Sequence, residues 1–473
     1  MPSYARGSRP GHKGISTWRA PPWHHFDALS DAIRFFAATD VGNVREHNED
    51  NFLVDKKLSL FMVADGMGGH AAGEVASAIA VRTIHEEIKR ERDLLTDFTA
   101  GSRGASRVTN KDILALMEHA VHRACARIHE EAQADSAKRG MGTTLSALLI
   151  LGTRAFIAHV GDSRIYLQRG GRVQQITEDH TVFNELIKRG KLTKEQIEKV
   201  GHKNAITRAV GVYERVDVDT LMLEVLPGDD FLLASDGLTG YLETADELAP
   251  WLQQEGDKAV KGLVDLAKER GGKDNITVVV VRLSGEADSD ERAKRLALKR
   301  ETLARMPLFA RLSDRELLRV MQSVEVRHYE HDQLVIREGD KGDELFIVLS
   351  GKVRVSRGGE TLTRLGAGEH FGEMALIRAV PRSATVNADG KAELIAIRRV
   401  DFFELLRSEH EIAVKMLWQF LGVLADRLDA TSSELRHAKQ ELHAEQGEDI
   451  TDAAMEIFPG LEPGSAPFGR RSP

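Results

Sequence analysis

The stretch Val63–Glu74 reads VADGMGGHAAGE and connects an apolar run to the beginning of a predicted helix. It places a single aspartate, Asp65, at the end of the apolar run, with three glycines in the next four positions. A turn needs glycine, but it does not need that carboxylate. We therefore interpret Asp65 as a metal ligand, and the glycines, first of all Gly66, as residues that clear space around it.

Further carboxylates stand in the same context, each beside an apolar strand-like run. They are Glu49 and Asp50 in VREHNEDN, Asp162 in VGDSR, Asp236 in LLASDG and Asp274 in GGKDN. Carboxylates at strand ends can meet at one edge of a sandwich, where they repel one another unless a cation lies between them. Oxygen ligands without His or Cys select hard ions such as Mg²⁺ or Mn²⁺. Each aspartate taken alone is better explained as a turn former or helix cap, but their joint order favours the metal site.

Strands and helices are mixed in this part of the chain. Strands are predicted at 58–64, 143–150, 155–160, 164–168, 218–225, 230–234 and 276–283, and helices at 71–95 and 111–134. The glycine pair at 170–171 predicts a hairpin and hence antiparallel pairing. Cys125 lies on the apolar face of the second helix, where inert packing is favoured over catalysis.

The motifs follow the order R-x-x-N-E-D, V-A-D-G-M-G-G, M-G-T-T, G-D-S-R, S-D-G and K-D-N. In this order they make the segment from about Phe36 to Leu283 resemble the bacterial form of the metal-dependent (type 2C) serine/threonine protein phosphatases. The resemblance implies an α+β fold, an αββα sandwich of two antiparallel sheets flanked by helices. It also implies a site for two Mg²⁺ or Mn²⁺ ions at one end of the sandwich.

The resemblance also implies roles for single residues. Asp65 would bridge the two ions and Gly66 would offer its carbonyl, while Asp236 and Asp274 would bind one ion. Glu49 would hold waters on the other ion, with Asp50 in support, and Asp162 together with Asp236 would form a weaker third metal site. Arg45 would hold the substrate phosphate as a forked donor, so that Arg45, Asp65 and Asp236 form the catalytic set.

Two positions depart from parts of the family pattern. Met67 stands where some members have a proton-donating histidine, and His70 is a candidate substitute, although a helix-start role is favoured for it. The polar stretch 182–204 corresponds to the flap beside the site, and its usual His-Pro pair is His202-Lys203 here.

A second pattern, HFGEMALIRAVPRSATV, occupies residues 370–386. It predicts a helical turn at 374–377, whose exposed amides would suit an anion, followed by one arginine, Arg382. The segment from Leu308 to about Ala444 resembles the cyclic-nucleotide-binding domains of catabolite activators and cyclic-nucleotide-dependent kinases, which implies a small β-barrel (jelly roll) with flanking helices. By this resemblance Glu373 would bind the ribose 2′-hydroxyl and Arg382 the cyclic phosphate. Further contacts would come from Gly372, Ala375 and Ser383. We expect cyclic AMP ahead of cyclic GMP.

The predicted organisation has five parts. They are a disordered lead-in (1–30), a phosphatase domain (31–284), a linker helix (285–305), a cyclic-nucleotide-binding domain (306–430) and a helix end with a disordered tail (431–473). Leu428, Leu435 and Leu442 repeat by seven, which indicates either a coiled coil, and so a homodimer, or a helix packed on its own domain. Pro/Gly-rich sequence in place of a helix-turn-helix at the end argues against a transcription factor.

Bulk properties limit the partners. The formal net charge of −8 gives no electrostatic reason to expect nucleic acid binding. No apolar stretch is long enough for a membrane span, and the single cysteine favours a reducing, cytoplasmic location. We expect an enzyme that hydrolyses phosphoserine and phosphothreonine in proteins, works beside serine/threonine kinases and is regulated by a cyclic nucleotide. The alternatives are an inactive phosphoprotein-docking sensor of cyclic nucleotide, or an active enzyme whose second domain is an inert docking module.

Overall fold

The computed structural model describes residues 33–68, 72–101, 108–188, 205–284, 289–378 and 381–457. It divides into two compact units, Met1–Ala293 and Lys294–Pro473. The boundary falls within helix α10 (Ser289–Arg305), in the segment predicted as a linker helix. Within the described residues, no helix combines the length and the apolar character that a membrane span needs.

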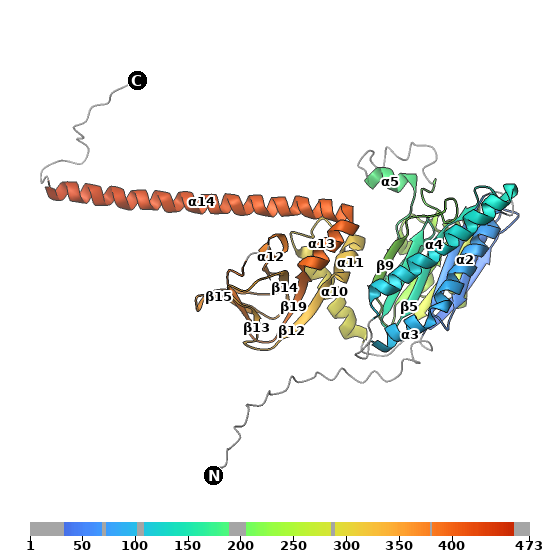
Figure 1. Cartoon of the computed structure of the whole chain (residues 1–473), viewed down its shortest axis with the longest axis horizontal. Coiled ribbons are helices and arrows are strands. Elements are labelled where there is room, and N and C mark those ends of the chain that lie inside the picture. The colour runs from blue at the N-terminus through green and yellow to red at the C-terminus, as the bar shows by residue number, and fades with distance from the viewer. Residues whose placement is uncertain are drawn as a thin grey trace, which may run out of the picture. The chain divides into compact units, whose positions relative to one another are not determined.

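Two antiparallel sheets form the centre of the first unit (Figure 1). The first has the strand order β2-β3-β5-β6-β9, with β4 (Gly142–Thr143) paired to β3. Its strands are β2 (Asp50–Asp55), β3 (Leu60–Met67), β5 (Leu145–Leu151), β6 (Arg154–Val160) and β9 (Asp219–Glu224). The second has the order β1-β11-β10-β7-β8, with β1 (Ile33–Asp40), β11 (Ile276–Leu283), β10 (Asp230–Ala234), β7 (Arg164–Arg169) and β8 (Arg172–Gln175). The predicted hairpin is present, because Arg169 pairs with Arg172 across two glycines of positive φ.

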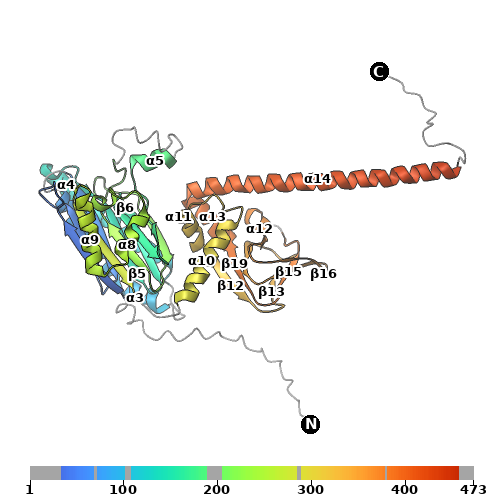
Figure 2. The ribbon, with the colours of Figure 1, turned by 180° about the vertical axis from the view of Figure 1, so that it is seen from behind.

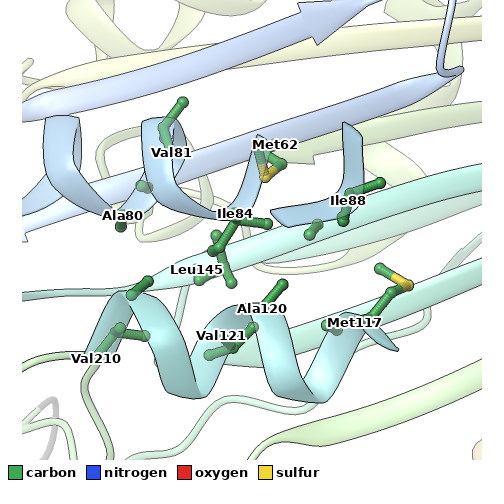
Figure 3. Close-up of a cluster of buried hydrophobic side chains, with 14 of the residues drawn as sticks. Met62, Ala80, Val81, Ile84, Ile88, Met117, Ala120, Val121, Leu145 and Val210 are labelled. Atoms are coloured by element: carbon green, nitrogen blue, oxygen red, sulfur yellow. The ribbon is translucent and has the colours of Figure 1, made fainter. Parts of the chain in front are cut away.

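Alternation along β3 shows how the layers are built. Leu60, Met62 and Ala64 belong to the apolar cluster beneath helices α2 (Ala72–Arg90) and α4 (Asn110–Ala134), as Figure 3 shows around Met62. Phe61 points to the opposite face because side chains alternate along a strand, and its ring lies 6.1 Å from that of Phe35 in β1. The core therefore has a layer on each side of this sheet.

Helices α8 (Ala249–Leu252) and α9 (Gly256–Glu269) pack against the second sheet (Figure 2). With α2 and α4 on the first sheet, this completes the expected αββα order. The single helix expected at 71–95 is instead two, α2 and α3 (Arg92–Gly101), separated at Glu91. The turn there folds α3 back onto the core, where Phe98 packs edge-on against Phe156 with ring centroids 5.4 Å apart.

The second unit contains two antiparallel four-stranded sheets, ordered β12-β19-β14-β17 and β13-β18-β15-β16. Their strands are β12 (Val324–Tyr329), β13 (Leu334–Ile336), β14 (Glu344–Ser350), β15 (Val353–Arg357), β16 (Glu360–Leu365), β17 (His370–Phe371), β18 (Thr385–Ala388) and β19 (Ala392–Arg398). Among the described strands no ladder joins the two sheets, so the expected small β-barrel is a jelly-roll sandwich without a closed barrel.

Helices precede and follow the strands of this sandwich, and one short helix, α12, lies between β17 and β18. They are α10, α11 (Asp314–Gln322), α12 (Met374–Ile377), α13 (Arg399–Ser408) and α14 (His410–Ile457). Leu303, Leu317, Phe402 and Met416 from four of them share one apolar cluster with strands β14 and β19. Helix α14 continues to Ile457, well into the segment 431–473 for which a helix end and a disordered tail were expected, because the Ala-, Glu- and Met-containing sequence there favours helix.

Candidate functional site

The acidic residues predicted as ligands lie at one end of the αββα sandwich. Asp50 opens β2 and stands opposite Asp65 of β3 in the strand register. Asp162 follows β6, Asp236 begins α7 (Asp236–Thr239) directly after β10, and Asp274 precedes β11. Because antiparallel pairing brings the end of one strand beside the start of the next, residues far apart in the sequence meet here.

A cavity of about 610 Å³ opens at this end. Its lining includes six of the predicted site residues, together with Arg45: Glu49, Asp65, Gly66, Asp162, Asp236 and Asp274. Asp50 does not line it. Asp50 lies buried behind the cavity and accepts a hydrogen bond of 2.7 Å from Ser235 Oγ. The structure thus brings the predicted ligands to one pocket, with Asp50 as their support from behind.

The carboxylates of this pocket raise one another's pKa values. Burial, followed by the charges of Asp50 and Asp236, raises the pKa of Asp65 well above its ordinary value. Burial and the charge of Asp236 raise the pKa of Asp162 to about 7, and burial is also the main reason why the pKa of Asp50 rises to about 7. Such crowding is unfavourable for the protein alone, so the pocket is suited to a compensating positive charge.

Buried acceptor atoms provide the direct test of whether a cation fits. Within the described part of the chain, Glu49 Oε1, Asp50 Oδ1 and Asp236 Oδ1 are buried and have no hydrogen-bond donor. Buried polar atoms normally have partners, so unpaired acceptors from different elements indicate a missing positive partner. The donor set is entirely oxygen, which fits Mg²⁺ or Mn²⁺. The described residues nevertheless form no ready-made cluster of three ligating side chains, as expected for mutually repelling carboxylates.

Gly66 allows close approach of three backbone segments. A Cβ on Gly66 would lie 2.1 Å from the carbonyl oxygen of Gly73 and 2.6 Å from that of Glu49. Gly73 in turn has no room for a Cβ, which would lie 2.6 Å from Glu49 Oε1. Because Gly66 and Gly73 have no side chains, the start of α2 and Glu49 can occupy the space beside them.

Arg45 lies at the mouth of the pocket, with about half of its side chain exposed. Its Nη2 donates to Asp274 Oδ2 over 2.8 Å, and this hydrogen bond raises the pKa of Arg45 above its ordinary value. A charged, accessible guanidinium beside the carboxylates is suited to holding an anion. Met67 also lines the pocket, whereas His70 and most of the predicted flap (189–204) lie outside the described residues.

Several polar residues that support the ligands were not assigned a role from the sequence. Asn275 donates from Nδ2 to the carbonyls of Val41 and His47 and accepts from the amide of Glu49 at 2.8 Å. Thr144 Oγ1 accepts from the Asp65 amide at 2.9 Å. Asn275 follows the predicted ligand Asp274 and Thr144 lies in the M-G-T-T motif, but their partners are backbone atoms more than 70 positions away, so the local sequence does not show these roles.

The second predicted site centres on Arg382, of which only 8% is exposed. Its Nη2 donates to the carbonyl of Glu344 over 2.8 Å and its Nη1 to that of Gly372 over 3.4 Å, while Nε is buried without a partner. Burial lowers the pKa of Arg382 below its ordinary value. Gly372 adopts φ +80°, and a Cβ there would lie 2.6 Å from Arg382 Nη1, so glycine makes the slot for the guanidinium.

The other predicted contacts surround this arginine. Glu373 immediately precedes α12, the helical turn expected at 374–377, and its charge acts on Arg382. Ala375 is buried in that turn, and Ser383 is exposed directly after Arg382. The arrangement offers one buried cation, one carboxylate and a helix start, which suits a ligand that carries both a phosphate and a hydroxyl.

Comparison with known proteins identifies both domains. The Protein phosphatase 2C family model matches residues 43–258, and the Cyclic nucleotide-binding domain model matches residues 326–409. The serine/threonine phosphatase stp of Listeria innocua is 38% identical over 250 residues, which cover 51% of this chain and 93% of that protein. Protein phosphatase PhpP of Streptococcus pneumoniae is 38% identical over 255 residues, or 52% of this chain and 96% of that protein.

A solved structure, that of the Mycobacterium tuberculosis serine/threonine phosphatase PstP/Ppp, is 35% identical with a TM-score of 0.47, covering 54% of this chain and 99% of that one. The phosphatase match includes the first five motifs of the acidic pattern and ends before K-D-N, and the nucleotide-domain match includes the whole pattern at 370–386. The chain therefore belongs to the protein phosphatase 2C family of serine/threonine phosphatases and carries a cyclic nucleotide-binding domain C-terminal to its phosphatase domain in the sequence.

Proposed function

We propose that this chain hydrolyses phosphoserine and phosphothreonine in proteins with the help of bound Mn²⁺ or Mg²⁺. The observation that carries the proposal is the set of buried, unpaired carboxylate oxygens: Glu49 and Asp236 line one open pocket and Asp50 lies behind it. Asp65, Gly66, Asp236 and Asp274 would hold the ions together with Glu49, and Asp162 with Asp236 would hold a third. When bound, the ions supply a water of lowered pKa as nucleophile and neutralise charge on the phosphate.

Arg45 binds and orients the substrate in this proposal. Its guanidinium stands at the pocket mouth, where two of its N–H groups can reach two phosphate oxygens at once. It would then stabilise the negative charge that the equatorial oxygens carry during in-line attack. Met67 has no proton to give to the leaving serine or threonine oxygen, so this proton comes from elsewhere in the pocket.

The test is hydrolysis of phosphoserine, phosphothreonine and phosphotyrosine peptides by the full chain, with Mn²⁺ and after chelation. We expect Mn²⁺-dependent turnover of the first two peptides and its loss in Asp236→Asn. A folded chain that binds phosphopeptide but never turns it over would instead support the docking sensor.

For the second domain we propose a cyclic nucleotide as regulatory ligand, cyclic AMP ahead of cyclic GMP. Support comes from Arg382, a buried arginine whose Nε has no partner and which lies within reach of Glu373's charge. Regulation requires that nucleotide bind two states of the enzyme unequally. Calorimetry with each nucleotide, followed by phosphatase assays with and without it, tests binding and regulation separately. Binding without any change in rate would make the domain a docking module.

A homodimer through α14 belongs to the same proposal. Val414, Leu421, Leu428 and Leu435 repeat by seven and are 55 to 67% exposed, which leaves an apolar stripe open along the helix. A second copy carries the same stripe in the same register, as a two-fold interface requires. Sedimentation of the full chain and of Leu428→Asp tests this. The single cysteine supports a cytoplasmic location, and the phosphatase family supports serine/threonine kinases as signalling partners.

A further inference from the structure

A buried polar cluster lies beside the carboxylate pocket and is not used by the proposed reaction. It contains two histidines, His159 and His180, which are 1% and 4% exposed and whose ring centroids lie 5.0 Å apart. His159 contacts Ser146 Oγ through Nδ1 and the Glu178 carbonyl through Nε2, each at 3.0 Å. His159 is thus accounted for as a satisfied core residue, whereas the contacts of His180 lead toward the pocket.

His180 holds the turn that precedes Asp162. The amide of Gly161 donates to His180 Nδ1 over 3.1 Å, and the amide of His180 donates to the Gly161 carbonyl over 2.7 Å. Gly161 has φ +106°, a conformation that most residues avoid, and a Cβ there would lie 2.7 Å from the Thr144 side chain. Paired contacts from His180, one through its ring and one through its backbone, therefore help to fix this backbone conformation.

The tautomer of His180 follows from these contacts. Nδ1 accepts a hydrogen bond from a backbone amide, so a neutral ring carries its proton on Nε2, which also lies 3.3 Å from Arg208 Nη1. Nε2 lies 3.4 Å from Asp219 Oδ2, and the other oxygen of Asp219 receives Arg208 Nη1 at 2.9 Å. Burial would raise the pKa of Asp219, but the hydrogen bond from His180 and the charge of Arg208 hold it below its ordinary value. An ionised Asp219 thus orients the ring so that Nδ1 faces Gly161.

The backbone of the same residue also contacts the segment that contains Ile206, another residue of the pocket lining. The His180 carbonyl accepts from the Thr207 amide at 2.7 Å, and Thr181 pairs with Ile206. Ile206 and Asp162 both line the carboxylate cavity. His180 therefore connects two parts of the pocket lining that are 44 positions apart in the sequence (206 minus 162).

We propose that His180 is a positioning residue of the phosphatase site, whose ring, oriented by Asp219, fixes the Gly161 turn and so places Asp162 in the pocket. The inference rests on the proposed function, because the role of Asp162 as an ion ligand belongs to it. The alternative is a purely structural histidine, whose removal would lower stability without a selective effect on the ion that Asp162 holds.

The experiment uses Mn²⁺ titration calorimetry on the full chain, with peptide hydrolysis as a second readout. The Asp162→Asn variant serves as the reference for loss of the weaker Mn²⁺ site in the calorimetric titration. We expect His180→Ala to weaken that site at least tenfold, to leave the tighter sites unchanged and to lower kcat with little change in KM for the peptide. In a double-mutant cycle, His180→Ala should have no additional effect on Mn²⁺ binding once Asp162→Asn is present.

Two further variants separate positioning from stability. His180→Asn keeps a short side-chain acceptor near the Gly161 amide, so it should restore most of the weaker Mn²⁺ binding. His122→Ala is the matched control, because His122 is a histidine of the same unit that contacts a backbone carbonyl, that of Val216 at 3.0 Å, away from the pocket. If His180→Ala does not fold, Asp219→Ala should show the same selective weakening with the ring still in place.

Unaltered Mn²⁺ binding by His180→Ala, or equal effects of His180→Ala and His122→Ala, would overturn this inference and leave the proposed phosphatase function untouched. Effects of His180→Ala and Asp162→Asn that add would also overturn it. If the unaltered chain bound no Mn²⁺ at all, the proposed function would fail and this inference with it.

Discussion

Arg45 and Asp274 form an ion pair across the mouth of the carboxylate pocket, with 2.8 Å between Nη2 and Oδ2. In the proposed function the two residues have different partners, a phosphate for Arg45 and a metal ion for Asp274. The pair therefore holds each side chain near its position until those partners arrive, and its surface exposure keeps the cost of breaking it low.

Replacement of Arg45 tests the phosphate contact. We expect Arg45→Ala to lower kcat/KM for a phosphothreonine peptide about 10- to 100-fold, since a charge-assisted hydrogen bond contributes ~1.5–3 kcal/mol. Arg45→Lys should recover only part of the loss, because an ammonium group cannot make the forked contact. Mn²⁺ binding by calorimetry should remain. Full activity in Arg45→Ala would remove Arg45 from the substrate site.

Replacement of Asp65 should separate stability from activity. Asp65→Asn removes a charge that lies among carboxylates, so the metal-free chain should melt about 2–4 °C higher, equivalent to ~1 kcal/mol. The same variant should lose hydrolysis and most of the stabilisation by Mn²⁺, which for the parent is ~2.7 kcal/mol at a hundredfold excess over Kd. Scanning calorimetry with and without Mn²⁺ measures both effects. A lower melting temperature in the metal-free variant would contradict the electrostatic account.

The pH dependence of stability should include a contribution from Asp219. Its pKa is held below the ordinary value in the folded chain, so the folded state binds fewer protons than the unfolded state as the pH falls. The stabilisation is complete above the unfolded pKa of about 4 and is lost as the pH drops toward the folded pKa. Asp219→Asn should cost ~1–3 kcal/mol at pH 7 and progressively less below about pH 4. Urea unfolding at several pH values measures this, and a cost that does not vary with pH would contradict it.

Replacement of Arg382 tests the nucleotide pocket. Arg382→Ala should weaken cyclic AMP binding at least tenfold, since it removes the single buried cation expected to meet the phosphate. Arg382→Lys should also bind weakly, because the slot formed with Gly372 fits a planar guanidinium. Calorimetry on the full chain gives both affinities, and Arg378→Ala, a change of an exposed arginine nearby, is the matched control. Equal affinities in all three variants and the parent would place the nucleotide elsewhere.

The sequence predicted best those elements whose signal is local. The strands ending in the acidic motifs and the turn at Met374–Ile377 were recognised from short apolar runs and glycines. Strands β1 and β2 and helix α9 were missed. The phenylalanines and alanines of β1 acquire a strand role only from pairing with β11, more than 230 positions later. Pairing across that distance leaves no trace in local periodicity.

The residues of the candidate site also differ in how far the sequence could predict them. Ligand types could be predicted because carboxylates beside glycines carry their chemistry in the sequence. The supporting residues could not, because Asn275, Thr144 and His180 act through backbone atoms of distant segments. Each amide or hydroxyl is an ordinary surface group until the fold supplies its partner.

Ser235 and Asp50 show what this architecture demands of the chain. Ser235 Oγ, at the end of a strand of one sheet, donates to Asp50 Oδ2, on the first residue of a strand of the other sheet. Any sliding of one sheet over the other would pull this contact apart together with the ligands on either side. The alignment of the whole sandwich is consequently fixed to within a hydrogen-bond length at this end, so a core substitution far from the pocket can reduce catalysis without touching a ligand.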